Sequence, residues 1–80
     1  MFKNKNEDGT LNLCSKRITE LRIEKKLSQR AFAEKLQLMG IDLNKNAIQQ
    51  IESGKRFVTD IELKSIALFF NVTTDELVKS

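Results

Sequence analysis

The 80-residue chain contains no histidine, tryptophan, tyrosine or proline, and it has a single cysteine, Cys14. Without histidine it lacks the usual general base and the commonest metal ligand. One cysteine can form neither an internal disulfide nor a cysteine-based zinc site. Cys14 lies in a helical pattern, so we expect it to act as a small buried hydrophobic residue. We predict no metal, no cofactor and no small-molecule substrate, and enzyme is the poorest hypothesis for this chain.

Long apolar segments are missing as well. The longest uninterrupted apolar run spans residues 66–70, far short of the ~20 residues that a membrane-spanning helix needs. The first ten residues, MFKNKNEDGT, contain no apolar region typical of a secretory signal. A lone thiol suits a reducing compartment. We therefore expect a soluble, cytoplasmic protein without a membrane partner.

Charge is present, but it is distributed unevenly. Residues 1–56 hold twelve of the fourteen Lys and Arg residues and seven of the eleven acidic residues, whereas residues 57–80 are acidic in balance. Positive charge gathered in one part of a small chain suits a polyanionic partner, because bound counterions are released on association. The length allows one domain with one core.

Apolar residues recur at helical spacing, and no segment alternates with the period of a strand, so we predict an all-α domain. Residues 1–11 are polar and are expected to form a flexible arm ahead of a domain at 12–80. Five helices are expected: about 12–26, from Ser28 to near Gly40, 45–53, about 60–70, and a short last helix after Thr73.

Local signals support these boundaries. Ser28 and Asn44 are good N-caps, and glycines stop helices by adopting a left-handed conformation. Two Thr-x-x-Glu segments, 59–62 and 73–76, have the form of a capping box. The residues expected to face inward are Leu13 or Cys14, Ile18, Leu21, Leu27, Phe32, Ala33, Leu36, Ala47, Ile48, Ile51, Leu63, Ile66, Ala67, Phe70 and Leu77. The apolar residues of 37–44 are expected to pack against the domain.

The helix at 45–53 has a narrow apolar stripe and an outer face rich in amides, formed by Lys45, Asn46, Gln49 and Gln50. Asn and Gln can each form two hydrogen bonds with adenine, and Lys donates to guanine. Lys55 and Arg56 follow directly and are placed to meet phosphate. The ordinary alternative is a solvated helix face, so this stretch alone does not decide the function.

Three runs considered together are more specific: LRIEKKLSQRAFAEKL (21–36), AIQQIESGKR (47–56) and DIELKSIALFFNVTTDEL (60–77). They resemble the helix-turn-helix domain of phage repressor and Cro-like regulators, the XRE family, over about residues 12–78. The resemblance implies a five-helix lambda-repressor-like fold. Its second and third helices form the helix-turn-helix, and the third helix enters the major groove of double-stranded DNA.

The resemblance also assigns roles to individual residues. It implies base contacts from Lys45, Asn46 and Gln50, with Gln49 close to base or backbone. It implies phosphate contacts from Gln29, Lys55 and the residues after Lys55, and Arg30 is a plausible addition. The family pairs the positions of Arg22 and Glu52 in an internal ion pair, which we interpret as architecture. One departure is the eight residues between Leu36 and Lys45, more than in the short form of the family. The extra residues must either lengthen the second helix or give a lengthened turn.

The predicted function is a sequence-specific DNA-binding transcriptional regulator, most simply a repressor on a two-fold operator. Small modules bury little surface on DNA, so we expect a homodimer on the operator. Its candidate surface is formed by Ile61, Leu68, Phe69 and Val78, unless these residues simply complete the core. The alternative function is a protein-interaction module, such as an antitoxin or immunity-type partner, that uses the same apolar surface.

Overall fold

The computed structural model describes residues 11–78, which form five α-helices and, within that range, no strand. The helices are α1 (Ser15–Glu24), α2 (Gln29–Leu38), α3 (Lys45–Glu52), α4 (Asp60–Phe70) and α5 (Thr74–Val78). The all-α, five-helix prediction is confirmed. The predicted arm at 1–11 lies almost wholly outside the described residues. Its last residue, Leu11, donates its backbone N–H to the carbonyl of Gly54 over 2.8 Å.

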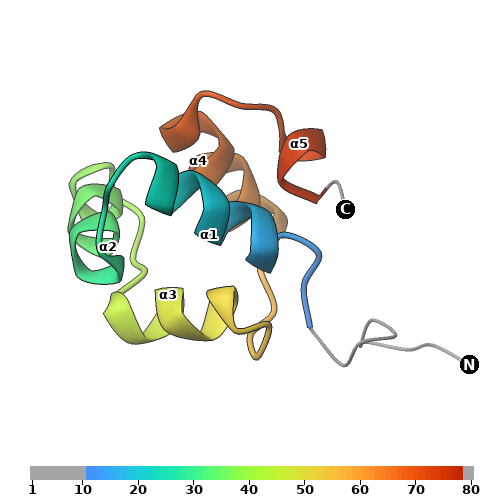
Figure 1. Ribbon diagram of the computed structural model, residues 1–80, viewed down its shortest axis with the longest axis horizontal. Helices are drawn as coiled ribbons and strands as arrows, with labels where there is room; N and C mark the ends of the chain where they lie inside the picture. The colour runs from blue at the N-terminus through green and yellow to red at the C-terminus, as the bar shows by residue number, and fades with distance from the viewer. Residues whose placement is uncertain (1–10, 79–80) are drawn as a thin grey trace, which may run out of the picture.

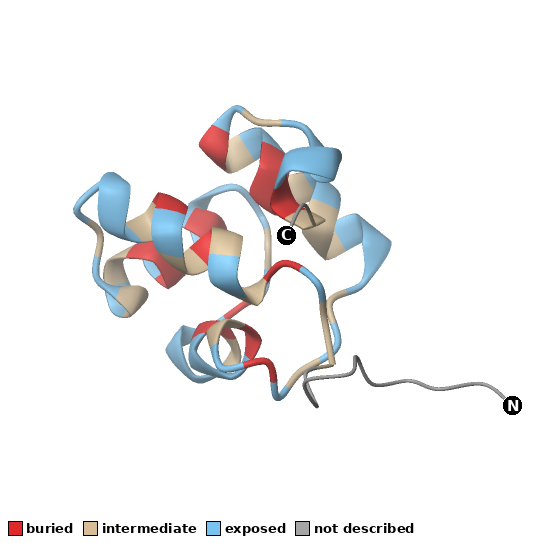
Figure 2. Ribbon diagram, turned by 45° about the vertical axis from the view of Figure 1, so that its right-hand side comes forward, coloured by how far each residue is buried: buried red, intermediate tan, exposed pale blue. Residues whose placement is uncertain are grey.

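The helices are arranged around α1, which crosses the middle of the molecule with α3 on one side and α4 and α5 on the other (Figure 1). The helices α2 and α3 pack on each other, and α1 contacts both α3 and α5. Buried residues face the centre from every helix, and exposed residues line the outside (Figure 2). The core consists of Cys14, Ile18, Leu21, Phe32, Ala33, Leu36, Leu43, Ile48, Ile51, Ile66, Ala67, Phe70 and Leu77.

Side-chain caps set the starts of four helices. Ser28 and Asn44 accept the backbone N–H groups of the residues three positions on, at 3.0 and 2.8 Å. Thr59 and Glu62 form both bonds of a capping box, and the Thr73 hydroxyl accepts the N–H of Glu76. Each bond satisfies a donor that a helix start leaves without an internal partner.

The first four helices end in the same way, with one residue in the left-handed conformation. The next residue in each case donates its N–H to the carbonyl five positions back, as in a Schellman motif. Glycine allows this conformation at two of the ends, but lysine and asparagine adopt it at the others. The four residues are Lys26, Gly40, Gly54 and Asn71.

Two details of the prediction are wrong. The first helix begins at Ser15 and not near residue 12, because the Asn12 side chain accepts the N–H of Cys14 and holds the preceding residues in a turn. In the connection from α2 to α3, Leu43 is buried and Ile41 packs on the core. Leu38, however, is 89% exposed, and Met39 is also exposed. Leu38 lies two positions after buried Leu36, which directs it to the opposite face of the helix.

Within residues 11–78, no helix is long and apolar enough to cross a membrane.

Candidate nucleic-acid interface

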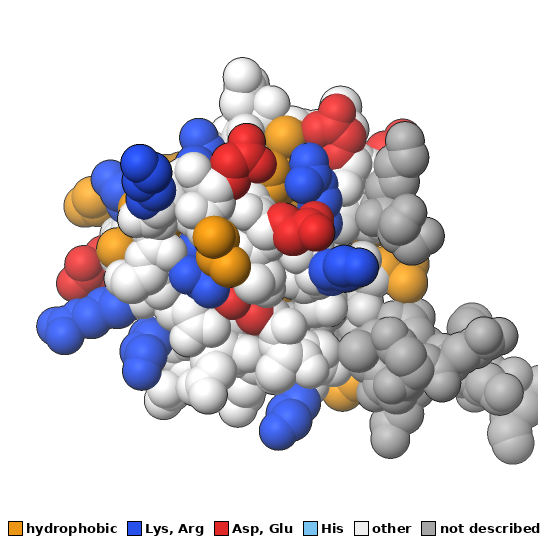
Figure 3. All heavy atoms as spheres, viewed as in Figure 1, with side chains coloured by type: hydrophobic (Ala, Val, Ile, Leu, Met, Phe, Trp, Pro, Cys, Tyr) orange, Lys and Arg blue, Asp and Glu red, His pale blue; other side chains and the backbone are white. Residues whose placement is uncertain are grey.

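The outer face of α3 carries the four residues proposed to read bases. The side chains of Ile48 and Ile51 are fully buried, which fixes the rotation of α3 about its axis. The opposite face is therefore turned to solvent, and all four polar side chains are exposed: Lys45, Asn46, Gln49 and Gln50. The helix forms the lower edge of the molecule in Figure 1, where uncharged side chains predominate and Lys and Arg side chains lie around them (Figure 3).

The start of α2 lies beside α3. Ser28 caps α2 by accepting the N–H of Ala31. Gln29, the first residue of α2, is half-buried, and its Nε2 donates to Glu52 Oε1 over 3.1 Å. Arg30 is exposed and lies 3.7 Å from Glu34. Gln29 and Arg30 are the first two residues of α2. A helix N-terminus favours anions because its backbone N–H groups have no partner within the helix.

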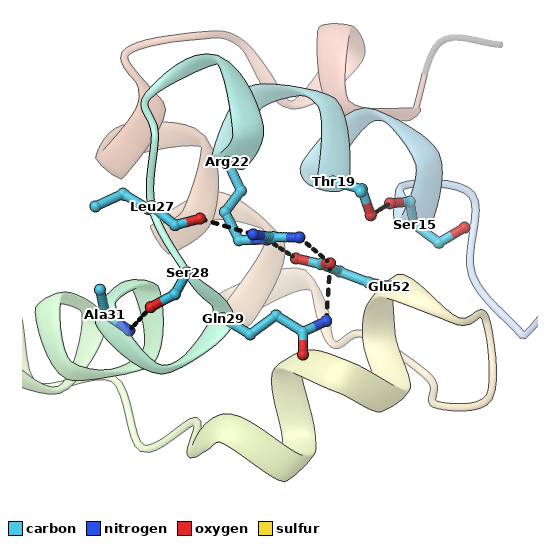
Figure 4. Close-up of polar contacts among 8 residues, drawn as sticks. All are labelled: Ser15, Thr19, Arg22, Leu27, Ser28, Gln29, Ala31 and Glu52. Carbon is cyan, nitrogen blue, oxygen red and sulfur yellow. Dashed lines mark hydrogen bonds and ion pairs between the residues drawn. The ribbon is translucent and has the colours of Figure 1, made fainter.

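Arg22 of α1 and Glu52 of α3 form the ion pair that the resemblance implies. The guanidinium donates from Nε to Oε2 over 2.7 Å and from Nη2 to Oε1 over 3.1 Å. Its Nη1 donates to the carbonyl of Leu27 over 2.7 Å (Figure 4). The side chains are 14% and 6% exposed. This two-bond geometry joins α1, the α1–α2 junction and the end of α3.

Residues 39–44 connect α2 to α3, and both ends of this segment are fixed. At its start Gly40 adopts a positive φ, and Ile41 donates to the carbonyl of Leu36. At its end Leu43 is buried and Asn44 caps α3. The longer turn is thus compatible with two packed helices, because Ile41 and Leu43 hold the chain on the core while Met39 and Asp42 are exposed.

A family model described as a helix-turn-helix domain matches residues 15–80. The chain belongs to the helix-turn-helix domain family. The match confirms the resemblance to phage repressor and Cro-like domains, as well as the fold class. Helix-turn-helix domains of this family bind DNA and are not enzymes. No curated protein and no solved structure matches the chain significantly.

Two further cations of this helix-turn-helix domain follow α3 directly. Lys55 is exposed, and its backbone N–H closes the end of α3 on the carbonyl of Gln50. Arg56 is half-buried, and its Nη2 lies 3.2 Å from the Glu62 carboxylate of α4. Lys55 is therefore placed to meet a phosphate, whereas Arg56 already has a carboxylate partner. Their contacts with DNA stay predictions.

The helix-turn-helix domain also exposes apolar side chains on α4. Ile61 is 75% and Leu68 66% exposed. Phe69 is half-buried, with its ring centroid 5.3 Å from that of Phe32, and Val78 packs partly on the core. The four residues of the candidate dimer surface thus differ in burial. Ile61 and Leu68 are free to contact a partner, whereas Phe69 and Val78 also contribute to the core.

Asn12 was expected only to begin the first helix, yet its side chain contacts the end of α3. Its Nδ2 donates to the carbonyls of Ile51 and Arg56 over 3.2 and 2.8 Å. An asparagine just before a helix indicates a local turn, but contacts with residues about forty positions away leave no local signal.

Cys14 has the buried role expected from the sequence. It is 1% exposed, and burial raises the pKa of its thiol to about 11. The thiolate, which is the nucleophilic and metal-binding form, is therefore disfavoured. Within residues 11–78, no group of His, Cys, Asp or Glu side chains could hold a metal ion.

Proposed function

We propose that this domain is a sequence-specific transcriptional regulator that reads DNA bases through the outer face of α3. The observation that carries the proposal is the contrast between the two faces of α3. Two fully buried isoleucines, Ile48 and Ile51, hold the helix against the core, while four exposed Lys, Asn and Gln side chains face solvent. Those side chains have hydrogen-bonding groups that match base edges in the major groove.

The surroundings of α3 suit the phosphate backbone. The N-terminus of α2 with Gln29 and Arg30 lies beside α3, and Lys55 follows its end. Phosphate contacts orient a protein on the duplex, and base contacts then supply the specificity. We infer that Lys45, Asn46 and Gln50 contact bases, that Gln49 lies close to base or backbone, and that Gln29, Arg30, Lys55 and Arg56 contact phosphates.

The regulator is proposed to act as a repressor that occupies an operator and excludes polymerase. A single small module buries only roughly 600–1,000 Å² on DNA. Two copies on a two-fold site, with half-sites about one helical turn apart, increase the affinity. A homodimer on DNA is therefore part of the proposal, with Ile61 and Leu68 as the exposed apolar residues of the contact.

Selection of bound sites from a random duplex pool tests the proposal. The native chain and Gln50→Ala are compared at one salt concentration. An enriched inverted repeat whose base preference relaxes in Gln50→Ala supports base reading by α3. If no sequence is enriched and the chain shows only salt-sensitive, nonspecific binding, the result contradicts base reading by α3.

A second candidate function is a protein-interaction module, because Ile61 and Leu68 are both exposed and, seven positions apart, lie on one face of α4. Exposed apolar patches are typical of interaction sites. Salt separates the two functions. Binding through several phosphates weakens steeply as salt rises, whereas an apolar protein interface responds little. Gel filtration of native chain and Leu68→Lys shows whether that surface holds a second copy.

A further inference from the structure

Glu52 holds the side chain of Gln29 as well as that of Arg22. Its Oε1 accepts from Gln29 Nε2 and from Arg22 Nη2, each over 3.1 Å, and its Oε2 accepts from Arg22 Nε. Figure 4 shows the Arg22 guanidinium and the Gln29 amide converging on the same carboxylate from α1 and from the start of α2. The hydrogen-bond network of the ion pair thus extends to the first residue of α2, which lies next to the face proposed to contact DNA.

This contact determines the orientation of the Gln29 side-chain amide. An ionised carboxylate can only accept hydrogen bonds, so Gln29 must turn its NH₂ group, and not its carbonyl, toward Glu52. The amide nitrogen carries two N–H groups, and Glu52 accepts one of them. No acceptor within residues 11–78 takes the second. Gln29 therefore keeps one donor in a defined position at the N-terminus of α2.

We propose that Glu52 is a positioning residue for the DNA backbone: it holds Gln29 so that the second N–H of the amide donates to a phosphate oxygen. The inference rests on the proposed function. Glutamine is among the side chains that lose most rotamer freedom when they are fixed. If Glu52 fixes Gln29 already in the free protein, that loss no longer opposes DNA binding, which is how preorganisation increases affinity.

The simpler view is that Arg22 and Glu52 only join helices. The two roles can be separated, because a buried ion pair can often be replaced by apolar residues of similar size without loss of stability. The combined variant Arg22→Met, Glu52→Met, called the Met pair, is designed to keep the helices packed while it removes the carboxylate that holds Gln29. If the pair is architecture alone, restoring the packing restores every property of the domain.

The test is a cycle of four proteins: native chain, Gln29→Ala, the Met pair, and the Met pair with Gln29→Ala. Affinity for a fluorescent duplex enriched by the selection above is measured by anisotropy at one salt concentration. Gln29→Ala in the native background should lower the affinity about tenfold, because it removes a hydrogen bond to a charged phosphate. In the Met-pair background the expected loss is below about twofold.

Equal losses in the two backgrounds would overturn the proposal, and so would no loss in the native background. Because the Met pair could fold poorly, a second measurement uses the native chain alone. ¹⁵N relaxation gives the order parameter of the Gln29 side-chain amide, which should approach the value of rigid backbone, about 0.85. A value below about 0.6 would show that Glu52 does not immobilise this side chain. If an operator is enriched but Gln29→Ala loses equal affinity in both backgrounds, only this inference is wrong. If no sequence is enriched, the result counts against the proposed function.

Discussion

Asn12 and Arg56 lie 44 positions apart in the chain, and the Asn12 side chain donates to the Arg56 carbonyl over 2.8 Å. The same amide nitrogen donates to the carbonyl of Ile51, and its oxygen accepts the N–H of Cys14. The segment before α1 is thereby joined to the last turn of α3 and to the residues after it. One polar side chain thus helps to fix the end of the helix proposed to read DNA.

Replacing Asn12 should therefore destabilise the domain. Asn12→Ala removes the side-chain hydrogen bonds with Ile51, Arg56 and Cys14. The partly buried carbonyls of Ile51 and Arg56 lose a donor, so we expect a loss of about 2 kcal/mol in the free energy of unfolding. Asn12→Asp should be at least as harmful, because a carboxylate oxygen would then face the two carbonyls. Urea denaturation followed by circular dichroism measures both variants. If Asn12→Ala unfolds at the native midpoint, these contacts do not stabilise the end of α3.

Breaking the ion pair should cost more. Glu52→Ala leaves the Arg22 guanidinium without a carboxylate in a site where it is only 14% exposed. Removing one partner of a well-buried pair costs about 3–5 kcal/mol. The control is Arg17→Ala, which breaks an exposed pair with Glu20 at 3.4 Å and should cost less than about 1 kcal/mol. Thermal unfolding compares them, and equal effects would show that burial does not strengthen the Arg22–Glu52 pair.

Lys26 offers a way to stabilise the domain. It ends α1 with φ of 59°, and that conformation costs a residue with a Cβ roughly 1–2 kcal/mol. Glycine removes this strain but loses more chain entropy on folding, so Lys26→Gly should add up to about 1 kcal/mol. Lys25→Gly is the matched control, because Lys25 has φ of −83° and gains nothing from glycine. A lower melting temperature for Lys26→Gly would refute the argument.

Cys14 should make the domain less stable in alkali. The pKa of its thiol rises from the ordinary value of 9.0 to about 11 in the fold, since burial disfavours the thiolate. The folded state therefore favours the bound proton, and this contribution is complete below pH 9.0 and is lost as the pH rises to about 11. The loss of stability is measured against the pH profile of Cys14→Ala, which lacks the thiol. Identical pH profiles would exclude a contribution from the thiol.

Base reading and phosphate binding should respond differently to salt. Lys55→Ala should weaken binding to all duplexes alike and lower the slope of log K against log salt by roughly 0.9, because one fewer counterion is released. Gln50→Ala carries no change of charge, so the slope should stay the same while base preference relaxes. Titrations of an enriched duplex and a scrambled duplex at several salt concentrations measure both quantities. An unchanged slope for Lys55→Ala would place that lysine away from phosphate.

Local signals made most of the fold predictable. A capping side chain acts on N–H groups within three residues, so Ser28, Asn44 and Thr59 marked helix starts correctly. Helical spacing likewise identified the buried faces of α2, α3 and α4. At the start of α1 the spacing allowed either Leu13 or Cys14 to face inward. The structure buries Cys14 and leaves Leu13 exposed, because the turn held by Asn12 decides between neighbours that spacing cannot separate.

The candidate interface was predictable only in part. The outer face of α3 followed from the positions of its isoleucines. The partners of the surrounding polar residues did not follow, because Gln29 bonds Glu52 and Arg56 pairs with Glu62 across helix boundaries. Such contacts depend on how helices cross, and sequence spacing within one helix carries no information about crossing. The resemblance supplied the pairing of Arg22 with Glu52, but it did not include Gln29.

The bond from Leu11 to Gly54 has a practical consequence for handling the protein. Leu11 therefore lies beside the end of α3, the helix proposed to contact DNA. Val78, by contrast, belongs to α5, on the far side of α1 from α3 (Figure 1). Attachment to a sensor surface through the C-terminus is therefore expected to leave α3 open to a duplex.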